Sequence, residues 1–279
     1  MLLFLQIYFN IAVKIKKQLK YKTMIGALTG DYIGSVYEFC NTQDPYFPLV
    51  ESGKSITDDS ICTIAIANAI LENIPYEDAL KVVCLRHPFP MGGYGSGFGH
   101  WLWSDRPYQY NSCGNGSAMR VSAIGWAFEK EDVMLREAER SAMCTHNHKE
   151  GIKGAQATAH AVWFFRHYKS DLEGFRRLMT QYYPEWEMYY KPFREYNAYC
   201  QNTLPLCIQE VVYGTSYEDT IRNTILCGGD SDTNGAIAGA IAGARWGVPL
   251  DLWHSAYSTI DDDLKSIVDK FITKFNVTG

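Results

Sequence analysis

Residues 227–235 read Cys-Gly-Gly-Asp-Ser-Asp-Thr-Asn-Gly, and the chain continues as a run of small residues. Asp230 and Asp232 are one residue apart, and a glycine pair precedes them. Carboxylates at i and i+2 point to different faces of a helix, but on a turn that leads into a helix both can point to one spot. Divalent cations such as Mg²⁺ prefer oxygen ligands of this kind. The stretch therefore predicts half of a metal site at the start of a helix.

The run that follows predicts a helix with a thin coat of side chains. Glycine recurs at positions 235, 239 and 243, and alanine recurs at 236, 240 and 244. Small residues at this spacing allow other segments to approach closely, so we expect the helix to lie deep in the fold. It is too short for a membrane span and is interrupted by Asp232 and Arg245.

A second glycine stripe lies at the other end of the chain, in Met24–Glu38. Its glycines are at 26, 30 and 34, which on a helix would form one face open to another backbone. Glu38 is one further turn along the same face. Taken alone, Glu38 is better explained as the solvated end of a helix than as a functional residue.

Thr57-Asp58-Asp59-Ser60 opens an apolar helical pattern that runs to about Glu72. One interpretation is helix capping, since Thr, Asp and Ser are good N-caps and acids suit the first turn. A helix needs only one capping side chain, however, and here the oxygen-bearing residues are consecutive. If this turn, Glu38 and the Asp230–Asp232 turn converge, five carboxylates meet, and two divalent cations would nearly balance their charge.

About nine helical patterns and no convincing strand predict an all-α fold, with one domain over 24–279. The remaining predicted helices are Tyr76–Leu85, Ala118–Phe128, Asp132–Cys144, Gly154–Tyr168, Cys207–Gly214, Tyr217–Cys227 and Asp261–Phe275. Residues 91–99 are expected to form a glycine-rich loop, and residues 171–200, rich in aromatic side chains, a packing layer. Residues 1–23 hold five lysines and no acid. We favour an extension upstream of a start at Met24 over a short leading helix, and a helix lying on a membrane surface is a third, less favoured interpretation.

Composition excludes several classes of protein. The chain has 279 residues and a net charge of −5, which does not favour general binding of nucleic acid. The eight cysteines form no CxxC pair, so we expect free thiols and a cytoplasmic protein rather than a zinc site or a disulfide framework. His146 and His148 lack a third ligand at standard spacing, and a hydrogen-bonding or stacking role for one of them is favoured over metal ligation. The loop at 110–117 leads into a helix, which suits a phosphate or sugar oxygen.

Five ordered motifs together resemble the ADP-ribosylglycohydrolase family, the relatives of the dinitrogenase reductase-activating glycohydrolase. They are residues 26–38, Thr57-Asp58-Asp59-Ser60, Gly114-Asn115-Gly116-Ser117-Ala118-Met119-Arg120-Val121, Thr145-His146-Asn147-His148 with Gly151, and Gly228-Gly229-Asp230-Ser231-Asp232-Thr233-Asn234. The resemblance spans roughly residues 24–250. Ser60 and Ser231 stand where the family usually has threonine, and Lys149 where proline is common.

The resemblance implies a compact all-α fold with two Mg²⁺ or Mn²⁺ ions in a central cleft. It implies metal ligation by Thr57, Asp58, Asp59, Asp230, Asp232 and Thr233. Glu38 would be a mobile acidic residue that gates or touches the second metal. ADP-ribose would be held by Gly93, Tyr94, Gly95, Ser96, Gly97, Ser112, Cys113, Gly114, Asn115, Gly116 and His146.

The predicted function is metal-dependent hydrolysis of the bond at C1 of the distal ribose, which removes ADP-ribose from a protein side chain or another acceptor. Asp58 and Asp59 are the leading candidates for activating the attacking water, and Glu38 is the alternative base. Two other functions stay open: a hydrolase of free ADP-ribosyl compounds, and a non-catalytic reader or immunity protein that binds an ADP-ribosylated target or the transferase. No membrane partner is expected, and nucleic acid is expected only as a modified substrate.

Overall fold

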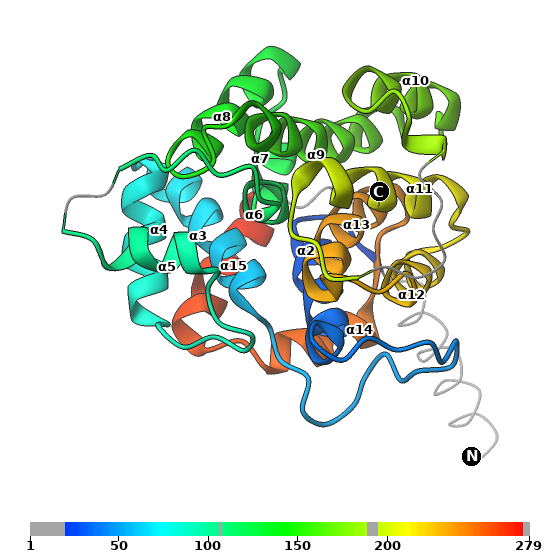
Figure 1. Cartoon of the computed structure of the whole chain (residues 1–279), viewed down its shortest axis with the longest axis horizontal. Coiled ribbons are helices and arrows are strands. Elements are labelled where there is room, and N and C mark those ends of the chain that lie inside the picture. Colours follow the sequence, from blue (N-terminus) through cyan, green and yellow to red (C-terminus); the bar gives the residue numbers. More distant parts are fainter. Residues whose placement is uncertain (1–19, 106–107, 189–194, 276–279) are drawn as a thin grey trace, which may run out of the picture.

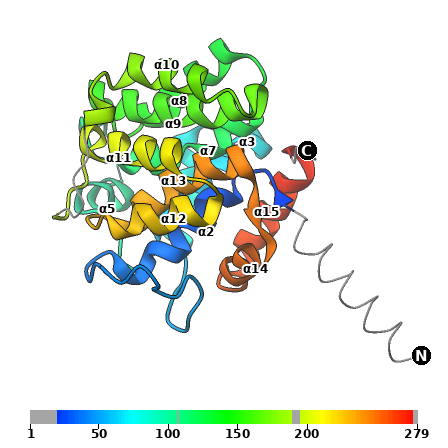
Figure 2. The same cartoon turned by 90° about the vertical axis from the view of Figure 1, so that its right-hand side faces the viewer.

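The computed structural model describes residues 20–105, 108–188 and 195–275, and it is built almost entirely of helices (Figures 1 and 2). The predicted all-α class is confirmed. The strands among these residues are two residues long: β1 (Lys20–Tyr21) pairs antiparallel with β2 (Val248–Pro249). β1 lies upstream of Met24, where we placed the start of the domain. Residues 1–19, which hold most of the predicted N-terminal extension, lie outside the described residues.

Most helices follow one another closely, and the longest connection, residues 38–57, precedes the helix that starts at Asp58. Their bounds are α2 (Ile25–Gly34), η1 (Ser35–Tyr37), α3 (Asp58–Glu72), α4 (Tyr76–Arg86), α5 (Ser96–Trp103), α6 (Gly116–Met119), α7 (Ser122–Ala127), α8 (Glu131–Met143), α9 (Lys149–Tyr168), α10 (Leu172–Tyr182), η2 (Trp186–Met188), α11 (Cys200–Tyr213), α12 (Tyr217–Leu226), α13 (Ser231–Trp246), α14 (Leu250–Ser258) and α15 (Asp262–Phe275).

The two glycine-striped segments form the antiparallel helix pair α2 and α13 at the centre of the molecule (Figure 1). A Cβ added to Gly30 would lie 2.6 Å from the carbonyl carbon of Gly235, so the two backbones are in direct contact. Every residue of α2 is buried, and α13 is buried through Ala244. The prediction that the C-terminal glycine helix lies deep is confirmed, and its partner is the N-terminal stripe.

The other helices surround this pair. In both views α8, α9 and α10 lie on one side of it and α14 lies on the opposite side (Figures 1 and 2). The surrounding helices contribute to the apolar core, with the fully buried rings of Trp101, Trp126, Trp186 and Phe165 among its largest side chains. Because α2 and α13 are buried on all faces, neither helix has distinct polar and apolar faces.

The helices predicted from Tyr76, Asp132, Tyr217 and Asp261 are confirmed to within one residue at each end. Three helices were missed: α5, α10 and α14. In α5 the glycines lower helix propensity, but the buried Phe98 and Trp101 stabilise the helix by packing. α10 lies inside the predicted aromatic packing layer, where its amphipathic pattern was hidden among other aromatic residues; the side chain of Asp171 caps its start.

Three other predicted helices differ in their bounds, and one of them is α11, which starts at Cys200, seven residues before the predicted Cys207. The segment 118–128, predicted as one helix, is divided at Arg120 into α6 and α7. The long helix α9 starts five residues before the predicted Gly154, because the His148 side chain accepts a hydrogen bond from the Glu150 amide and caps it. Lys149, where the family commonly has proline, is therefore the first residue of this helix.

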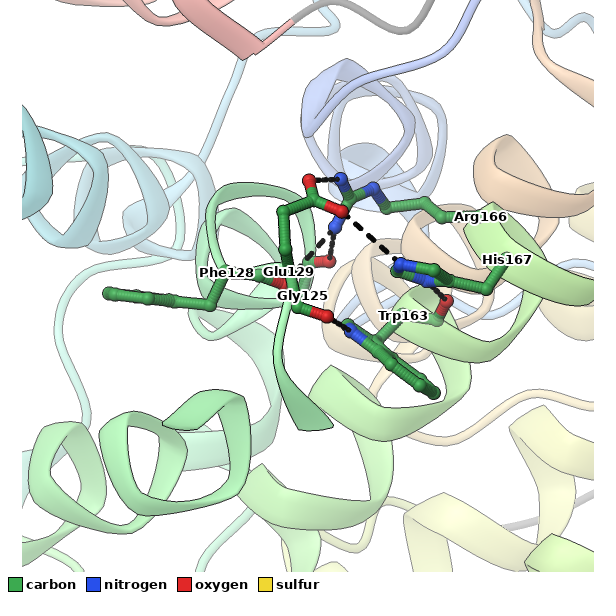
Figure 3. A network of polar contacts seen from close by, with 6 residues as sticks. All are labelled: Gly125, Phe128, Glu129, Trp163, Arg166 and His167. Atoms are coloured by element: carbon green, nitrogen blue, oxygen red, sulfur yellow. Dashed lines mark hydrogen bonds and ion pairs between the residues drawn. The ribbon is translucent and has the colours of Figure 1, made fainter. Parts of the chain in front are cut away.

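A polar network fixes the turn between α7 and α8 to α9 (Figure 3). Arg166 donates to the carbonyl oxygens of Gly125 (2.9 Å) and Phe128 (3.4 Å) and to the Glu129 carboxylate (2.6 Å). Trp163 Nε1 donates to the Glu129 carbonyl, and the His167 ring contacts the other carboxylate oxygen. The network therefore fixes the C-terminal end of α7 to α9, and α6 and α7 are the helices that follow the loop at 112–116.

Candidate metal centre and substrate cavity

In the Thr57–Ser60 turn the Thr57 side chain caps the helix, so the carboxylates of Asp58 and Asp59 are not needed for capping. Thr57 is the N-cap of α3, and its hydroxyl accepts the Asp59 amide at 3.2 Å. Capping was the competing interpretation of this motif, and Thr57 alone accounts for it. Asp58 and Asp59 stand in the first turn and are free for another role.

The Asp230–Asp232 turn likewise places two carboxylates at the start of a helix, α13. Asp230 is the N-cap residue, yet its side chain makes no capping hydrogen bond. Instead Asp230 Oδ2 accepts a hydrogen bond from Asn115 Nδ2 at 2.8 Å. Thr233, one residue further, donates to Asp59 Oδ2 at 3.2 Å and joins the two turns directly.

Asp31 is a sixth carboxylate that the prediction missed. It lies on α2, is fully buried, and accepts hydrogen bonds from the Thr57 amide (3.0 Å) and hydroxyl (2.8 Å) and from the amide and hydroxyl of Ser60. It therefore fixes the first turn of α3 from behind. The available signal was its place directly after Gly30, on the stripe that brings α2 against α13.

The carboxylates gather in two groups that share Asp232. Asp31, Asp59 and Asp232 offer oxygen atoms that all lie within 4.8 Å of one another, and so do Glu38, Asp230 and Asp232. The buried atoms Asp59 Oδ1 and Asp232 Oδ1 have no hydrogen-bond partner. Among the described residues, no lysine or arginine pairs with these carboxylates.

Unpartnered buried carboxylate oxygens are costly, and a hard cation is the ligand that would satisfy them. The donor set therefore fits divalent cations. The site is compatible with two cations, one for each group, with Asp232 able to contact both.

Burial and mutual repulsion raise the pKa values throughout the cluster. Desolvation, followed by the charge of Asp232, raises the pKa of Asp31 to about 7 and that of Glu38 to about 8. Asp58 and Asp59 are raised well above the ordinary pKa of aspartate, mainly by burial. Without cations, the cluster thus resists full ionisation at neutral pH.

We expect the metal-free protein to lose stability as the pH rises. Carboxyl groups whose pKa is higher in the folded state favour folding below their unfolded pKa, near 4, and this contribution is lost as the pH rises through the folded values near 7 and 8. In EDTA, the melting temperature should fall by several degrees between pH 5 and pH 8. Mg²⁺ or Mn²⁺ at pH 8 should restore it. Calorimetry with and without metal measures both effects, and an unchanged melting temperature in EDTA would contradict the charge repulsion.

The carboxylates form one wall of a cavity of about 360 Å³. Most of the predicted site residues line it: Glu38, Asp58, Asp59, Gly93, Tyr94, Gly95, Ser96, Gly97, Ser112, Gly114, Asn115, Gly116, His146, Asp230, Asp232 and Thr233. Thr57 and Cys113 are not among the lining residues. Thr57 lies behind the wall against Asp31, and the carbonyl oxygen of Cys113 accepts the amide of Cys200, the first residue of α11, at 3.1 Å.

The glycine-rich segment forms another wall and reaches Glu38. A Cβ at Gly92 would overlap with the Glu38 carboxylate, and Gly92 and Gly93 have φ values of +77° and +84°. The Tyr94 hydroxyl donates to the His87 carbonyl at 2.8 Å, which anchors the segment to the end of α4. Gly95 is the N-cap of α5, so the predicted loop ends in a helix N-terminus that faces the cavity.

His146 and the buried Arg120 line the side formed by the loop at 112–116. Thr145 Oγ1 lies 2.7 Å from His146 Nδ1 and accepts a hydrogen bond from Arg120. Burial, with a smaller contribution from Arg120, lowers the pKa of His146 well below its usual range, so the imidazole is neutral. The prediction did not include Arg120 in the site, although it belongs to the same motif as Asn115.

Two exposed aromatic rings also line the cavity, and neither was among the predicted site residues. Phe39 directly follows Glu38 and is 74% exposed, and Tyr196 is 54% exposed. Their rings stack with centroids 6.2 Å apart. The charges of Asp230 and Glu38 contribute, after burial, to a raised pKa of Tyr196, which places this pair near the carboxylates.

Comparison with known proteins gives one family across nearly the whole described chain. The model of the ADP-ribosylglycohydrolase family matches residues 20–279. Among curated proteins, the chain is 28% identical to the ADP-ribosyl-[dinitrogen reductase] glycohydrolase of Rhodospirillum rubrum over 51% of this chain and 49% of that protein. It is 26% identical to the human ADP-ribosylhydrolase ARH3 over 81% of this chain and 84% of the human protein.

The chain thus matches about half the length of the bacterial relative and most of the human one. A solved structure described as an ADP-ribosylglycohydrolase-related protein complex has the same fold, with a TM-score of 0.71, 21% identity, and coverage of 90% of this chain and 95% of that chain. In the described part of this chain, no helix has both the length and the apolar character needed to cross a membrane.

Proposed function

Because the chain belongs to the ADP-ribosylglycohydrolase family, we propose that this hydrolase releases ADP-ribose from a modified acceptor by cleaving the bond at C1 of the distal ribose. One observation supports this most strongly. The two carboxylate groups, with their unpartnered buried oxygens, stand in the same cavity as a glycine-rich segment and a loop-to-helix turn suited to a diphosphate.

We propose that the cations are held by Asp58, Asp59, Asp230, Asp232, Thr233 and Glu38, with Asp31 supporting the first turn of α3. Thr57 could join them through its hydroxyl, which here donates to Asp31. When bound, Mg²⁺ or Mn²⁺ would supply Lewis acidity at the ribose hydroxyls and at a water molecule, and would offset the charge of the cluster.

The protein's own groups would bind and orient the substrate. Ser96 and Gly97 line the cavity in the first turn of α5, and the amides of such a turn suit phosphate oxygens. The amides of Gly93, Ser112, Gly114 and Asn115 already donate hydrogen bonds within the protein. The neutral His146 can donate or accept a hydrogen bond at the same end without adding charge. Asn115 holds Asp230 in place, so its side chain acts on the carboxylate rather than on the ligand.

For the chemical step, we propose that Asp58 accepts the proton of the attacking water, with Glu38 as the alternative base. Asp58 lines the cavity and no hydrogen bond occupies its carboxylate among those found for the described residues. The acidic wall would stabilise the positive charge that develops at C1 in an oxocarbenium-like transition state.

The Phe39–Tyr196 pair places two exposed aromatic rings on the side of the cavity where we expect the acceptor. It lies beside the carboxylates, where the leaving group would depart, and its exposed rings can pack on an acceptor. We therefore propose that residues around this pair discriminate among acceptors.

A substrate panel tests the function directly. The chain would be incubated with an ADP-ribosylated arginine peptide, an ADP-ribosylated serine peptide, ADP-ribosylated DNA and free ADP-ribosyl compounds, each in Mg²⁺, in Mn²⁺ and in EDTA. We expect free ADP-ribose from at least one substrate with metal, and a loss of at least about 10²-fold in rate in EDTA. Full activity in excess EDTA would exclude the metal-dependent mechanism, and tight binding without product would favour the reader.

A further inference from the structure

The amide side chain of Asn41 joins the segment that carries Glu38 to the turn that carries Asp230. Its Oδ1 atom accepts the Gly229 amide at 2.9 Å, and its Nδ2 group lies 2.9 Å from the Gly229 carbonyl oxygen. One side chain thus pairs with both polar groups of a single residue of the backbone. Nδ2 also contacts the Tyr37 carbonyl oxygen at 2.6 Å and Ser231 Oγ at 3.1 Å.

These contacts lie next to the carboxylate group formed by Glu38, Asp230 and Asp232, on both of the chain segments that contribute to it. Tyr37 directly precedes Glu38, and Gly229 and Ser231 flank Asp230. Glu38, Asp230 and Asp232 are the residues whose oxygens meet in that group. Gly229 has a φ of +85°, a conformation that favours glycine. Because glycine has no side chain, the contacts that fix this turn must come from other residues.

The first carboxylate group is held by other means. Asp31 and Asp232 lie on α2 and at the start of α13, whose backbones are in direct contact, and Asp31 is bonded to Thr57 and Ser60. Asn41 makes none of these contacts. Removing its side chain should therefore loosen one group and leave the other in place.

We propose that Asn41 is a positioning residue that sets the distance of Glu38 from Asp230 and Asp232, and so determines the affinity of one of the two cation sites. The proposal rests on the proposed metal binding. It also gives Ser231 a role, since the serine hydroxyl accepts from Asn41 in place of the threonine usual in the family.

Asn41→Ala tests the proposal, with Asn223→Ala as the matched control. Asn41 and Asn223 are both only partly buried, and the side-chain hydrogen bond found for Asn223 joins it to Asp219 one turn away in α12, so both variants should fold. Mn²⁺ would be titrated into each metal-free protein by calorimetry, and bound Mn²⁺ would be counted by electron paramagnetic resonance. We expect Asn41→Ala to weaken one of two sites about 10- to 100-fold and to leave the other within about 2-fold.

Hydrogen exchange in EDTA measures the hydrogen bond from the Gly229 amide to Asn41 directly, without any metal or substrate. The Gly229 amide should exchange faster in Asn41→Ala than in the wild type or in Asn223→Ala, because it loses its acceptor. Unchanged Gly229 exchange, unchanged Mn²⁺ affinities, or equal weakening of both sites would each overturn the proposal. A wild type that bound no Mn²⁺ would contradict the proposed function instead, and the exchange result would still decide whether Asn41 holds the turn.

Discussion

Asp232→Asn is expected to lower the rate of ADP-ribose release by at least about 10³-fold while raising the melting temperature of the metal-free protein at pH 8. Asp232 is shared by both carboxylate groups, so its loss removes a ligand from each proposed cation site. Its negative charge also contributes to the raised pKa of Asp31, Glu38, Asp58, Asp59 and Asp230. Removing that charge relieves repulsion that metal-free protein at pH 8 must otherwise bear.

The two effects of opposite sign separate a functional role from a structural one. Asparagine keeps the shape of the side chain and changes its charge, so general misfolding would lower both quantities together. Asp251→Asn is the control, because Asp251 is an exposed acid in the first turn of α14, remote from the cluster. Activity assays in Mg²⁺ and thermal melts in EDTA measure the pair. A variant that retained activity would remove Asp232 from the proposed centre.

Gly30→Ala is expected to cost about 3 kcal/mol of folding free energy, although alanine is the better helix former. The added methyl group would lie 2.6 Å from the carbonyl carbon of Gly235 and 3.3 Å from the amide nitrogen of Ala236. Backbone atoms cannot turn away as a side chain can, so α2 and α13 would have to separate. For a chain of this size, the loss corresponds to a fall of roughly 6–12 °C in melting temperature.

Gly99→Ala is the matched control for this substitution. Gly99 is also in a helix, α5, but nothing lies within 4 Å of the Cβ that alanine would add. The same change there should stabilise the protein by about 0.5–1 kcal/mol. Urea denaturation of both variants gives the two free energies. If Gly30→Ala were as stable as the wild type, α2 and α13 could not be in backbone contact.

Separation of α2 from α13 should also weaken the metal centre. Asp31 is carried by α2, and Asp232 is in the first turn of α13, so their distance depends on the depth of the glycine contact. Gly30→Ala protein that remains folded should therefore bind Mn²⁺ more weakly than the wild type, whereas Gly99→Ala should not.

Helix positions were largely predictable because periodicity and capping act locally. The patterns at Tyr76, Tyr217 and Asp261 each have acids in the first turn and a clear apolar face. The prediction failed where tertiary packing overrode local preference. In α5, Gly97 and Gly99 argue against a helix, and only the burial of Phe98 and Trp101 makes one favourable. Residues 189–194 of the predicted aromatic layer lie outside the described part of the chain.

The metal-binding candidates were predictable for a different reason. Asp58–Asp59 and Asp230–Asp232 each place two carboxylates at the start of a predicted helix, so the local pattern alone indicated both turns. Asp31 was missed because its burial follows from the packing of α2 against α13, which its place beside Gly30 indicated only indirectly. Phe39 and Tyr196 were not among the predicted site residues, because nothing in the local sequence around either ring indicates a ligand, and only the folded structure brings the two rings together.

The sequence by itself therefore determined the helical class, the family, and the residue types available for binding cations. It did not determine that the two glycine stripes face one another. The tertiary structure decided this, because backbone contact at Gly30 and Gly235 requires both stripes and is a property of neither. That contact brings the two ends of the chain together, and with them Asp31, Asp59 and Asp232.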